Sequence, residues 1–412
     1  MTMRVRGVGA VVTGLVVAAV LSACAPVAGG LSVADGPPGV GANPITWQDV
    51  QRDGLGGARL VLLVSPYDAK AGHPARLGIV DEDGTTRFLD LDADPEAELG
   101  GRRGILCAQT ADAALRIDGR GAERQALPGP GGYGHATTVR ADGSCVRVMS
   151  GGVAWEQDGR GMTTGAWPAL PEATAVSEDA VWVATTDGDE PGTTVTLLRT
   201  DLTTGRTETV SQWPTLLRRE PDGRRLSGDL LVSELFRHDG RLHHLVEVSA
   251  RSGDDEPATI RPGVKSEVHL VSIDPRTGRR ESTALFVTRA GVEEPSEAGA
   301  HVPQGAHALF AGHLHDGSIF AVDADGEILA IDLGSRSVRV TGRLSPRARA
   351  ASDLVATWAA GSLTVVLRGE SGRVAVEDYD LATGRLRNST TLSGLRGVLS
   401  TRTFVSSLAV VG

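Results

Sequence analysis

Several residue types that identify particular protein classes are scarce in this 412-residue sequence. Only two of its 41 basic residues are lysines, Lys70 and Lys265, and no cluster of basic residues offsets the formal net charge of −10. Proteins that bind nucleic acid usually carry a concentrated positive charge, so no nucleic acid partner is predicted. Three cysteines are also too few for a disulfide-dense mini-domain or a cysteine-only metal cage.

The motifs of common catalytic sites are absent as well. The sequence contains no Gly-x-Ser-x-Gly nucleophile motif, no His-Glu-x-x-His zinc motif and no Gly-x-x-x-x-Gly-Lys phosphate loop. It does contain 53 Gly and 20 Pro, with 41% hydrophobic and only 4% aromatic residues. This composition differs from that of a coiled coil or a disordered acidic tail, and it is sufficient to bury a core. It therefore indicates a globular domain without indicating a reaction.

The first 24 residues have the layout of a bacterial export signal. Arg4 and Arg6 make the start positively charged, and residues 8–20 form an apolar run that is too short to cross a bilayer. The run leads into Leu21-Ser22-Ala23-Cys24, which resembles the lipobox of bacterial lipoproteins. The resemblance implies that residues 1–23 are a signal peptide, cut before Cys24, and that the Cys24 thiol carries a diacylglyceryl group. An ordinary secretory signal is the alternative.

A flexible tether is expected to follow the lipidated cysteine, over residues 24–44. Residues 25–44 contain five Gly and four Pro, and Asp35 is their only charged residue. Such a segment buries too little surface to offset its chain entropy, and as a coil it would span about 25 Å. The predicted location is thus the extracytoplasmic face of the cell membrane, with the lipid anchor as the membrane partner.

From residue 45 onward, short runs of Val, Leu and Ile alternate with turns, and one type of turn recurs. Clear copies of an Asp-x-x-Thr-Gly turn begin at Asp201, Asp274 and Asp380, and weaker turns begin at Asp81, Asp118, Asp158 and Asp332. Asp suits this position because its carboxylate accepts hydrogen bonds from nearby backbone amides, and Gly adopts the positive φ that a tight hairpin needs. Each copy therefore predicts a strand, a turn and a second strand.

The recurrence of this unit predicts the fold. A strand–turn–strand unit that repeats at roughly 40–50 residues is typical of a β-propeller. The sequence resembles the seven-bladed quinoprotein-like and YVTN-type propellers of bacteria, in which this turn joins the two outer strands of each blade. The resemblance implies that residues 45–412 form an all-β propeller of seven blades, each with four antiparallel strands. Two packed β-sandwiches are the alternative.

The last two blades are the clearest in the sequence. The expected strands are 307–315, 318–323, 327–332 and 338–343 in the sixth blade, and 354–359, 363–368, 373–380 and 385–392 in the seventh. Residues 403–411 then remain as an apolar run, while the first blade lacks a fourth strand. We expect residues 403–411 to complete the first blade and close the ring, because closure removes open sheet edges. Four strands are not recognisable in the second blade, between residues 92 and 130.

Cys107 and Cys145 occupy similar places in adjacent blades, 11 and 13 residues before Asp118 and Asp158. A disulfide between them is predicted because oxidation is permitted in an exported protein. Two buried free thiols are the alternative.

Metal and cofactor sites are not predicted. His313 and His315 alternate on a strand, so their rings can lie on one side, and His301 and His307 precede them. Nothing in the sequence fixes the three or four converging ligands that a metal needs. Quinone-dependent propellers carry repeated Trp motifs and adjacent cysteines, which this chain lacks, so no cofactor is expected.

Three long segments are expected to be loops on one face of the propeller, between the second and third strands of a blade or between blades. They are residues 211–227 with Arg218, Arg219, Arg224 and Arg225, residues 249–266 with Asp254, Asp255 and Glu256, and residues 288–304 with Glu293 and Glu294. Long loops on a rigid scaffold often bind partners, so these charged residues are the candidate binding residues. Tolerated surface insertions are the alternative.

Two functions follow from these expectations. The first is a lipid-anchored scaffold that recognises a protein, a glycan or another cell-envelope partner. The second is a hydrolase or lyase that acts on a sugar or lactone at the central channel. Binding is favoured because the expected inner strands offer few His, Asp or Glu residues, although three or more such groups at the channel would favour the enzyme.

Overall fold

The chain divides into Met1–Asp35 and Gly36–Gly412, and the fold described below belongs to the second unit. The computed structural model describes residues 43–66, 75–91, 98–109, 113–126, 134–157, 160–164, 167–186, 194–214, 216–219, 225–231, 233–251, 267–289, 292–295, 313–323, 325–351, 353–359, 361–369, 372–395, 398–399 and 403–412. No helix in this described part has the length and apolar character needed to cross a bilayer.

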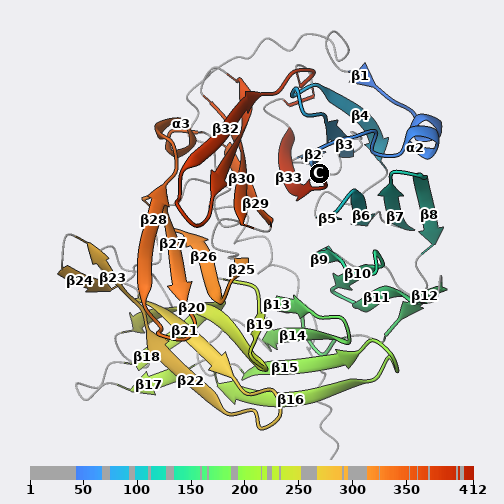
Figure 1. Ribbon diagram of the computed structural model, residues 1–412. Coiled ribbons are helices and arrows are strands. Elements are labelled where there is room, and N and C mark those ends of the chain that lie inside the picture. The colour runs from blue at the N-terminus through green and yellow to red at the C-terminus, as the bar shows by residue number, and fades with distance from the viewer. Residues whose placement is uncertain are drawn as a thin grey trace, which may run out of the picture. The chain divides into compact units, whose positions relative to one another are not determined.

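The described strands form seven sheets that follow one another around a ring, which is the arrangement of a seven-bladed β-propeller (Figure 1). Each blade has four antiparallel strands, called a to d from the centre outward, and three sheets carry additional strands at an edge. The predicted fold class is confirmed. Because successive strands are antiparallel, the a–b and c–d turns share one face of the ring, and the b–c and d–a connections share the other.

Blade 1 is built from both ends of the propeller unit. Strand β33 (Thr403–Val410) pairs antiparallel with β2 (Leu60–Pro66), and β3 (Ala75–Val80), β4 (Thr86–Leu91) and the short parallel β1 (Asn43–Pro44) complete the sheet. The last strand is therefore the innermost strand of the first blade, as predicted, and it covers the edge of β2. This pairing closes the ring.

A helix that the sequence analysis did not predict precedes β2. Helix α2 (Trp47–Asp53) begins with a capping box, in which Asp49 N–H donates to Thr46 Oγ1 (3.2 Å) and Thr46 N–H donates to the Asp49 carboxylate (2.8 Å). The two reciprocal bonds satisfy backbone N–H groups that a helix start leaves unpaired. Thr-x-x-Asp is thus the local signal for this helix.

Blade 2 consists of β5 (Leu99–Arg102), β6 (Ile105–Gln109), β7 (Ala113–Asp118) and β8 (Gly121–Ala126). Its strands are short, and β5 contains Gly100 and Gly101, which weaken a strand pattern in sequence. These glycines are required by packing, because a Cβ at Gly100 would lie 2.5 Å from the Thr137 carbonyl oxygen and one at Gly101 would lie 2.4 Å from that of Val410. Close approach of the two neighbouring blades thus explains why this blade was hard to recognise.

Blades 3, 4 and 7 are simple four-stranded sheets. They comprise β9 (Gly134–Val139), β10 (Cys145–Met149), β11 (Gly152–Gln157) and β12 (Arg160–Thr163); β13 (Pro171–Val176), β14 (Ala180–Thr186), β15 (Thr194–Asp201) and β16 (Thr207–Pro214); and β29 (Asp353–Ala359), β30 (Ser362–Arg368), β31 (Val374–Asp380) and β32 (Leu386–Thr391). Helix α3 (Pro346–Arg349) leads into blade 7.

Blades 5 and 6 carry extra strands. Blade 5 contains β17 (Leu216–Arg219), β18 (Arg225–Leu231), β19 (Phe236–His238), β20 (Arg241–Arg251), β21 (Glu267–Ile273) and β22 (Arg280–Ala284). Blade 6 contains β25 (His313–His315), β26 (Ser318–Val322), β27 (Glu327–Asp332) and β28 (Val338–Arg343), with β23 (Phe286–Arg289) and β24 (Val292–Pro295) beyond β28.

The Asp-x-x-Thr-Gly turns connect the c and d strands, as predicted. Between β15 and β16, Asp201 Oδ1 accepts hydrogen bonds from the backbone N–H groups of Thr203 (3.0 Å) and Thr204 (2.9 Å). Gly205 has a φ of 70°, and its N–H donates to the Asp201 carbonyl (2.8 Å). The equivalent glycines of blades 5 and 7 also have positive φ angles. The turn therefore uses Asp as an acceptor and Gly for its backbone freedom.

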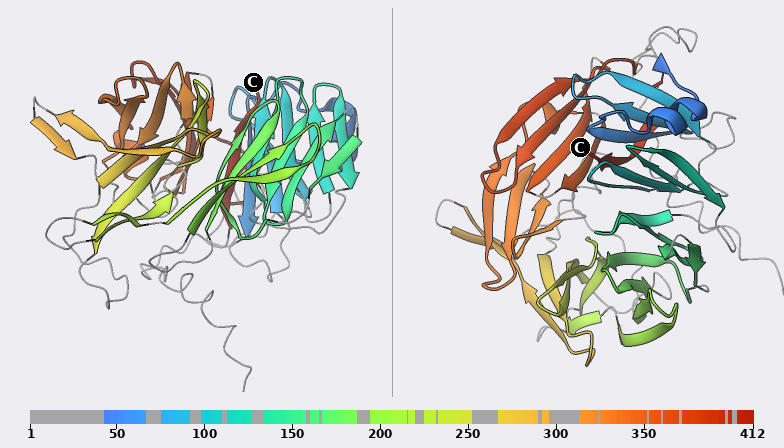
Figure 2. Two further views of the ribbon diagram at one scale, coloured as in Figure 1. Left: turned by 90° about the horizontal axis from the view of Figure 1, so that it is seen from below. Right: turned by 45° about the vertical axis from the view of Figure 1, so that its right-hand side comes forward.

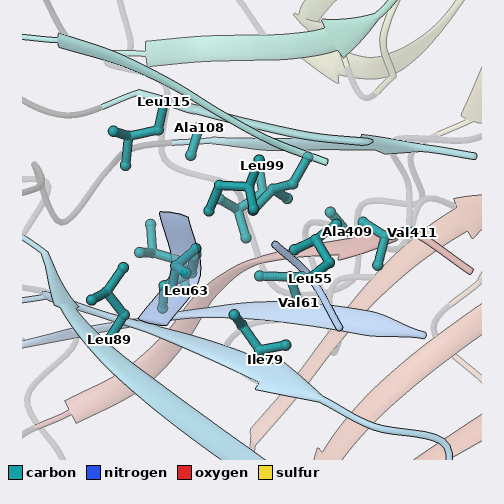
Figure 3. Packing of buried hydrophobic residues seen from close by; sticks show 14 of the residues in the cluster. Leu55, Val61, Leu63, Ile79, Leu89, Leu99, Ala108, Leu115, Ala409 and Val411 are labelled. Carbon is teal, nitrogen blue, oxygen red and sulfur yellow. The ribbon is translucent and has the colours of Figure 1, made fainter. Parts of the chain in front are cut away.

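The core lies in the interfaces between adjacent blades, which we call seams. In the described part of the chain, six seams each hold between 9 and 17 buried hydrophobic residues. Figure 3 shows the largest, in which Leu63 and Leu89 of blade 1 pack toward Ala108 and Leu115 of blade 2. The seam between blades 2 and 3 differs, because only three buried residues form its cluster: Cys107, Val139 and Cys145.

Candidate functional site

The arginine-bearing segment, residues 211–227, is not a loop, so this prediction is wrong. Arg218 and Arg219 lie in β17 and Arg225 lies in β18, whereas Arg224 falls outside the described residues. The cause is the length of β20, whose second half pairs with β18 from Val246 to Arg251. An uncovered strand edge leaves backbone N–H and C=O groups without hydrogen-bond partners. The β17–β18 hairpin supplies these partners to the second half of β20.

The acidic segment, residues 288–304, was also wrongly predicted to be a single loop. Glu293 and Glu294 lie in β24, which forms a hairpin with β23. Buried Val287 of β23 pairs in parallel with Val338 of β28, and the hairpin projects from the outer edge of blade 6 (Figures 1 and 2).

Residues 249–251 of the third expected loop continue β20. Asp254, Asp255 and Glu256 lie outside the described residues. The arginine-bearing β17 follows β18 on the inner side of the blade 5 sheet, and the glutamate-bearing β24 is outermost in the blade 6 sheet. Both segments still connect the last strand of one blade to the first strand of the next, but each forms strands of a sheet and not the expected loop.

The predicted disulfide is present. Cys107 of β6 and Cys145 of β10 are joined, with their Cα atoms 6.0 Å apart. The bond links blade 2 to blade 3 across the seam that has the smallest hydrophobic cluster among the described residues. In the chain-entropy estimate, closing a loop of this size stabilises the fold by about 3–4 kcal/mol.

Charged side chains surround the disulfide. Arg116 pairs with Cys107 in the blade 2 sheet, and its guanidinium lies 3.6 Å from the Glu156 carboxylate of blade 3. Arg147 follows Cys145 by two residues on the same face of β10 and is only 4% exposed. Burial lowers the pKa of Arg147 to about 10, although the Glu156 carboxylate acts in the opposite direction. This seam thus combines a covalent bond with buried charge.

A polar cavity of about 390 Å³ opens at the turn end of this seam. Its lining comes from the a–b turns of blades 3 and 4, the c–d turn of blade 4, and strands β7 and β11. The nine lining residues are Arg116, Arg140, Asp142, Ser144, Glu156, Gln157, Glu178, Leu202 and Thr203. The cavity lies on the face opposite the one that the sequence analysis expected to bind, and it was not predicted.

Hydrogen bonds within the turns hold the cavity wall in place. The Asp142 carboxylate accepts bonds from the Ser144 hydroxyl (2.6 Å) and the Ser144 N–H (2.9 Å). These bonds, the hydroxyl bond first, lower the pKa of Asp142. Arg140 donates to the Glu178 carbonyl (2.7 Å), and the Ala141 N–H donates to the Glu178 carboxylate (3.3 Å), which joins the turns of blades 3 and 4.

A second polar group lies at the inner strands. Glu98, just before β5, accepts a hydrogen bond from the Ser407 hydroxyl of β33 (2.9 Å). Glu234, just before β19, accepts bonds from the Thr174 N–H (2.6 Å) and hydroxyl (2.8 Å) of β13. Burial is the main cause that raises the pKa of Glu98 to about 7, and the Glu234 carboxylate acts in the same direction. Burial also raises the pKa of Glu234, so both carboxyls hold protons more tightly than usual.

Glu98 and Glu234 were not predicted from the sequence because neither belongs to a motif. Each accepts hydrogen bonds from a neighbouring blade, Glu98 from Ser407 of blade 1 and Glu234 from Thr174 of blade 4, so both depend on contacts between blades. The one local signal is that each glutamate precedes an inner strand, Glu98 by one residue and Glu234 by two.

His313 and His315 form a stack of rings at the inner strands of blades 6 and 7. Their ring centroids are 6.4 Å apart, and the His313 ring is also stacked on Trp358 of β29 at 6.4 Å. Burial lowers the pKa of His313 to about 4. In the part of the chain that the structure describes, no three His, Cys, Asp or Glu side chains gather as a metal site requires. His301 and His307 lie outside that part.

A family model described as "YycP, beta-propeller domain" matches residues 151–411. Among curated proteins, none matches this sequence.

Several solved structures are similar at low identity. Apo AztD from Citrobacter koseri is 12% identical, with 86% of this chain and 98% of that chain covered and a TM-score of 0.42. Virginiamycin B lyase from Staphylococcus aureus is 12% identical, with 69% and 83% covered and a TM-score of 0.37. The computationally designed Ika8 protein is 15% identical, with 73% and 88% covered and a TM-score of 0.39. At these values the structures support no inference about function.

Proposed function

The chain belongs to the family of YycP beta-propeller domains, and we propose that it is a lipid-anchored extracytoplasmic scaffold that recognises a protein, a glycan or another cell-envelope partner. The observation that carries this proposal is the polar cavity, because side chains from three blades converge there on a closed, cross-linked ring. Recognition sites are usually concave and largely preformed. The cavity has this character without depending on a mobile loop.

The disulfide supports the proposed location. Disulfides persist in oxidising compartments outside the cytoplasm, and Cys107 and Cys145 are joined. This agrees with export through the lipobox that ends at Cys24 and with a tether over residues 24–44.

The test of the location is intact-mass measurement of the protein from the membrane fraction. A chain that begins at a diacylglyceryl-modified Cys24 is the expected result, and Cys24→Ala is expected to leave the protein unprocessed or released. The control is the double variant Cys107→Ala/Cys145→Ala, which keeps the lipobox and should remain in the membrane fraction. An unmodified mature N-terminus elsewhere would contradict the proposal.

The predicted contact residues on β17 and β18 are tested by a pull-down from envelope extract. The variant replaces Arg218, Arg219, Arg224 and Arg225 with Ser. Fewer captured partners, together with unchanged folding, would assign recognition to this hairpin. An unchanged partner set would leave the polar cavity as the recognition site.

A hydrolase or lyase that acts on a sugar or lactone is the second candidate function, and the Glu98–Glu234 pair favours it. A carboxyl whose pKa is raised to about 7 can donate or accept a proton near neutral pH. Turnover of sugars and lactones that is abolished by Glu98→Gln and by Glu234→Gln, and unaffected by Glu327→Gln on β27, would establish this reaction. No turnover by the unaltered protein would leave binding as the function.

A further inference from the structure

We propose that the polar cavity between blades 2, 3 and 4 binds a neutral, polyhydroxylated ligand, namely a short segment of a glycan chain. The inference deepens the proposed recognition function, on which it rests, by naming the site and the ligand class. It is carried by the charge balance of the lining, the distances between its charged groups and its lack of apolar surface.

The charge balance disfavours ions of either sign. The lining contains two guanidinium groups, Arg116 and Arg140, and three carboxylates, Asp142, Glu156 and Glu178. An anion placed there would meet the carboxylates, and a cation would meet the guanidinium groups. A hydroxyl group is suited to both because it donates one hydrogen bond and accepts others.

The charged partners stand slightly too far apart to hydrogen-bond to each other. The N···O distance is 3.6 Å from Arg116 to Glu156, 3.7 Å from Arg140 to Asp142 and 3.5 Å from Arg140 Nε to the Glu178 carboxylate. A hydroxyl group placed beside such a pair can accept a hydrogen bond from the guanidinium and donate one to the carboxylate. Such bonds to charged groups are the stronger ones.

Donors in the lining are also left without partners. Within the described residues, the buried Nε groups of Arg116 and Arg140 have no hydrogen-bond acceptor, and neither does that of the adjoining Arg147. Buried polar groups are usually paired, directly or through water. Because these Nε groups are buried, a ligand would contact the exposed remainder of the Arg116 and Arg140 side chains.

The dimensions and surface of the cavity fit a short saccharide. A volume of about 390 Å³ lies within the range of small-molecule sites. Leu202 is the one apolar residue among the nine in the lining, so an apolar ligand would gain little. Ser144, Gln157 and Thr203 add neutral groups that both donate and accept.

The residues that line the cavity are already held in place by contacts within the protein. The Asp142–Ser144 turn is hydrogen-bonded internally, the Arg140–Glu178 contacts join two blades, and the disulfide fixes the third. A site whose groups are already ordered loses less conformational entropy on binding.

The experiment is calorimetric titration of the mature protein in detergent with cellotriose, maltotriose and the trimer of N-acetylglucosamine. At least one neutral trimer should bind with a Kd of about 1 mM or lower, and binding should change little between low and high salt because the ligand has no charge. Trigalacturonate and glucosamine trimer serve as charged counterparts. No binding by any neutral trimer, or tighter and salt-sensitive binding of a charged one, would overturn the proposal.

Variants locate the site. Arg116→Gln and Glu156→Gln should each weaken binding at least tenfold, whereas Arg276→Gln on the c–d turn of blade 5 and Glu327→Gln on β27 of blade 6 should leave it unchanged. Thr203→Trp, which fills the cavity and alters no charge, should abolish binding and shows the site even if a charge variant misfolds. Equal binding by Thr203→Trp would exclude the cavity. Cys24→Ala tests the membrane location separately, because the purified variant should still bind the saccharide.

Discussion

The two seams that flank blade 2 are held together by different kinds of interaction. On one side, 17 buried hydrophobic residues pack blade 2 against blade 1. On the other, the described hydrophobic cluster consists of Cys107, Val139 and Cys145, and a disulfide and charged side chains complete the contact. Adjacent residues of β6 face different seams, because Leu106 packs toward blade 1 and Ile105 packs toward blade 3. A propeller can thus replace apolar packing at one seam with a covalent link, and the space near that link is free to be polar.

Truncating two neighbouring residues of β6 is the most direct test of whether the two seams differ in their dependence on apolar packing. Leu106→Ala removes a fully buried side chain and is expected to lower the free energy of unfolding by about 2–5 kcal/mol. Ile105→Ala should cost clearly less, because Ile105 is only partly buried against the three-residue cluster. Urea denaturation of both variants measures the difference. Equal losses would mean that the two seams depend on apolar packing to the same extent.

Removing the disulfide tests the other side of blade 2. The double variant Cys107→Ala/Cys145→Ala is expected to lose about 3–4 kcal/mol of stability through greater chain entropy when unfolded. A reductant should lower the melting temperature of the unaltered protein and leave that of the double variant unchanged. If the reductant affects both equally, the loss does not come from this bond.

The seam between blades 4 and 5 offers a pH-dependent comparison, because His244 is 1% exposed there and both of its ring nitrogens lack hydrogen-bond partners among the described residues. Burial lowers the pKa of His244 to about 3 in the folded protein. The unfolded chain therefore binds more protons as the pH falls below about 6.5, and stability should decrease by up to about 1.4 kcal/mol per pH unit. His244→Leu should reduce this slope in denaturation experiments from pH 7 to pH 5, and an unchanged slope would assign it to other groups.

The smallest expected effect is the coupling between Arg116 and Glu156. The pair is partly exposed and its atoms are 3.6 Å apart, so a double-mutant cycle with Arg116→Gln and Glu156→Gln should give about 0.2–1 kcal/mol. A larger coupling energy would show that charge, and not only the disulfide, holds this seam together.

The features that could be predicted from the sequence depend on residues close in the chain or on the number of strands that each blade needs. The turns at Asp201 and Asp380 could be predicted because their hydrogen-bonding residues are close in the chain. The fourth strand of blade 1 could be predicted because only residues 403–411 were left to supply it. The disulfide followed from similar offsets in neighbouring units.

The features that were missed depend on contacts between distant segments. The β17–β18 hairpin forms because β20 is long enough to need a partner, which the residues of the hairpin do not reveal. The cavity requires side chains from three blades, and Glu98 and Glu234 each accept hydrogen bonds from a neighbouring blade. No pattern within a single blade carries this information.

The pairing of β33 with β2 has a consequence for the time course of folding. Bonds such as the one from the Ser406 hydroxyl to the Leu63 carbonyl connect residues 343 positions apart, and β33 is synthesised after every other described strand. Until it arrives, β2 keeps an uncovered edge, and contacts of such high sequence separation form slowly. A chain that ends before β33 would leave the edge of β2 unpaired. Unpaired strand edges favour aggregation and expose the chain to proteases. Ring closure therefore depends on the last described strand, β33.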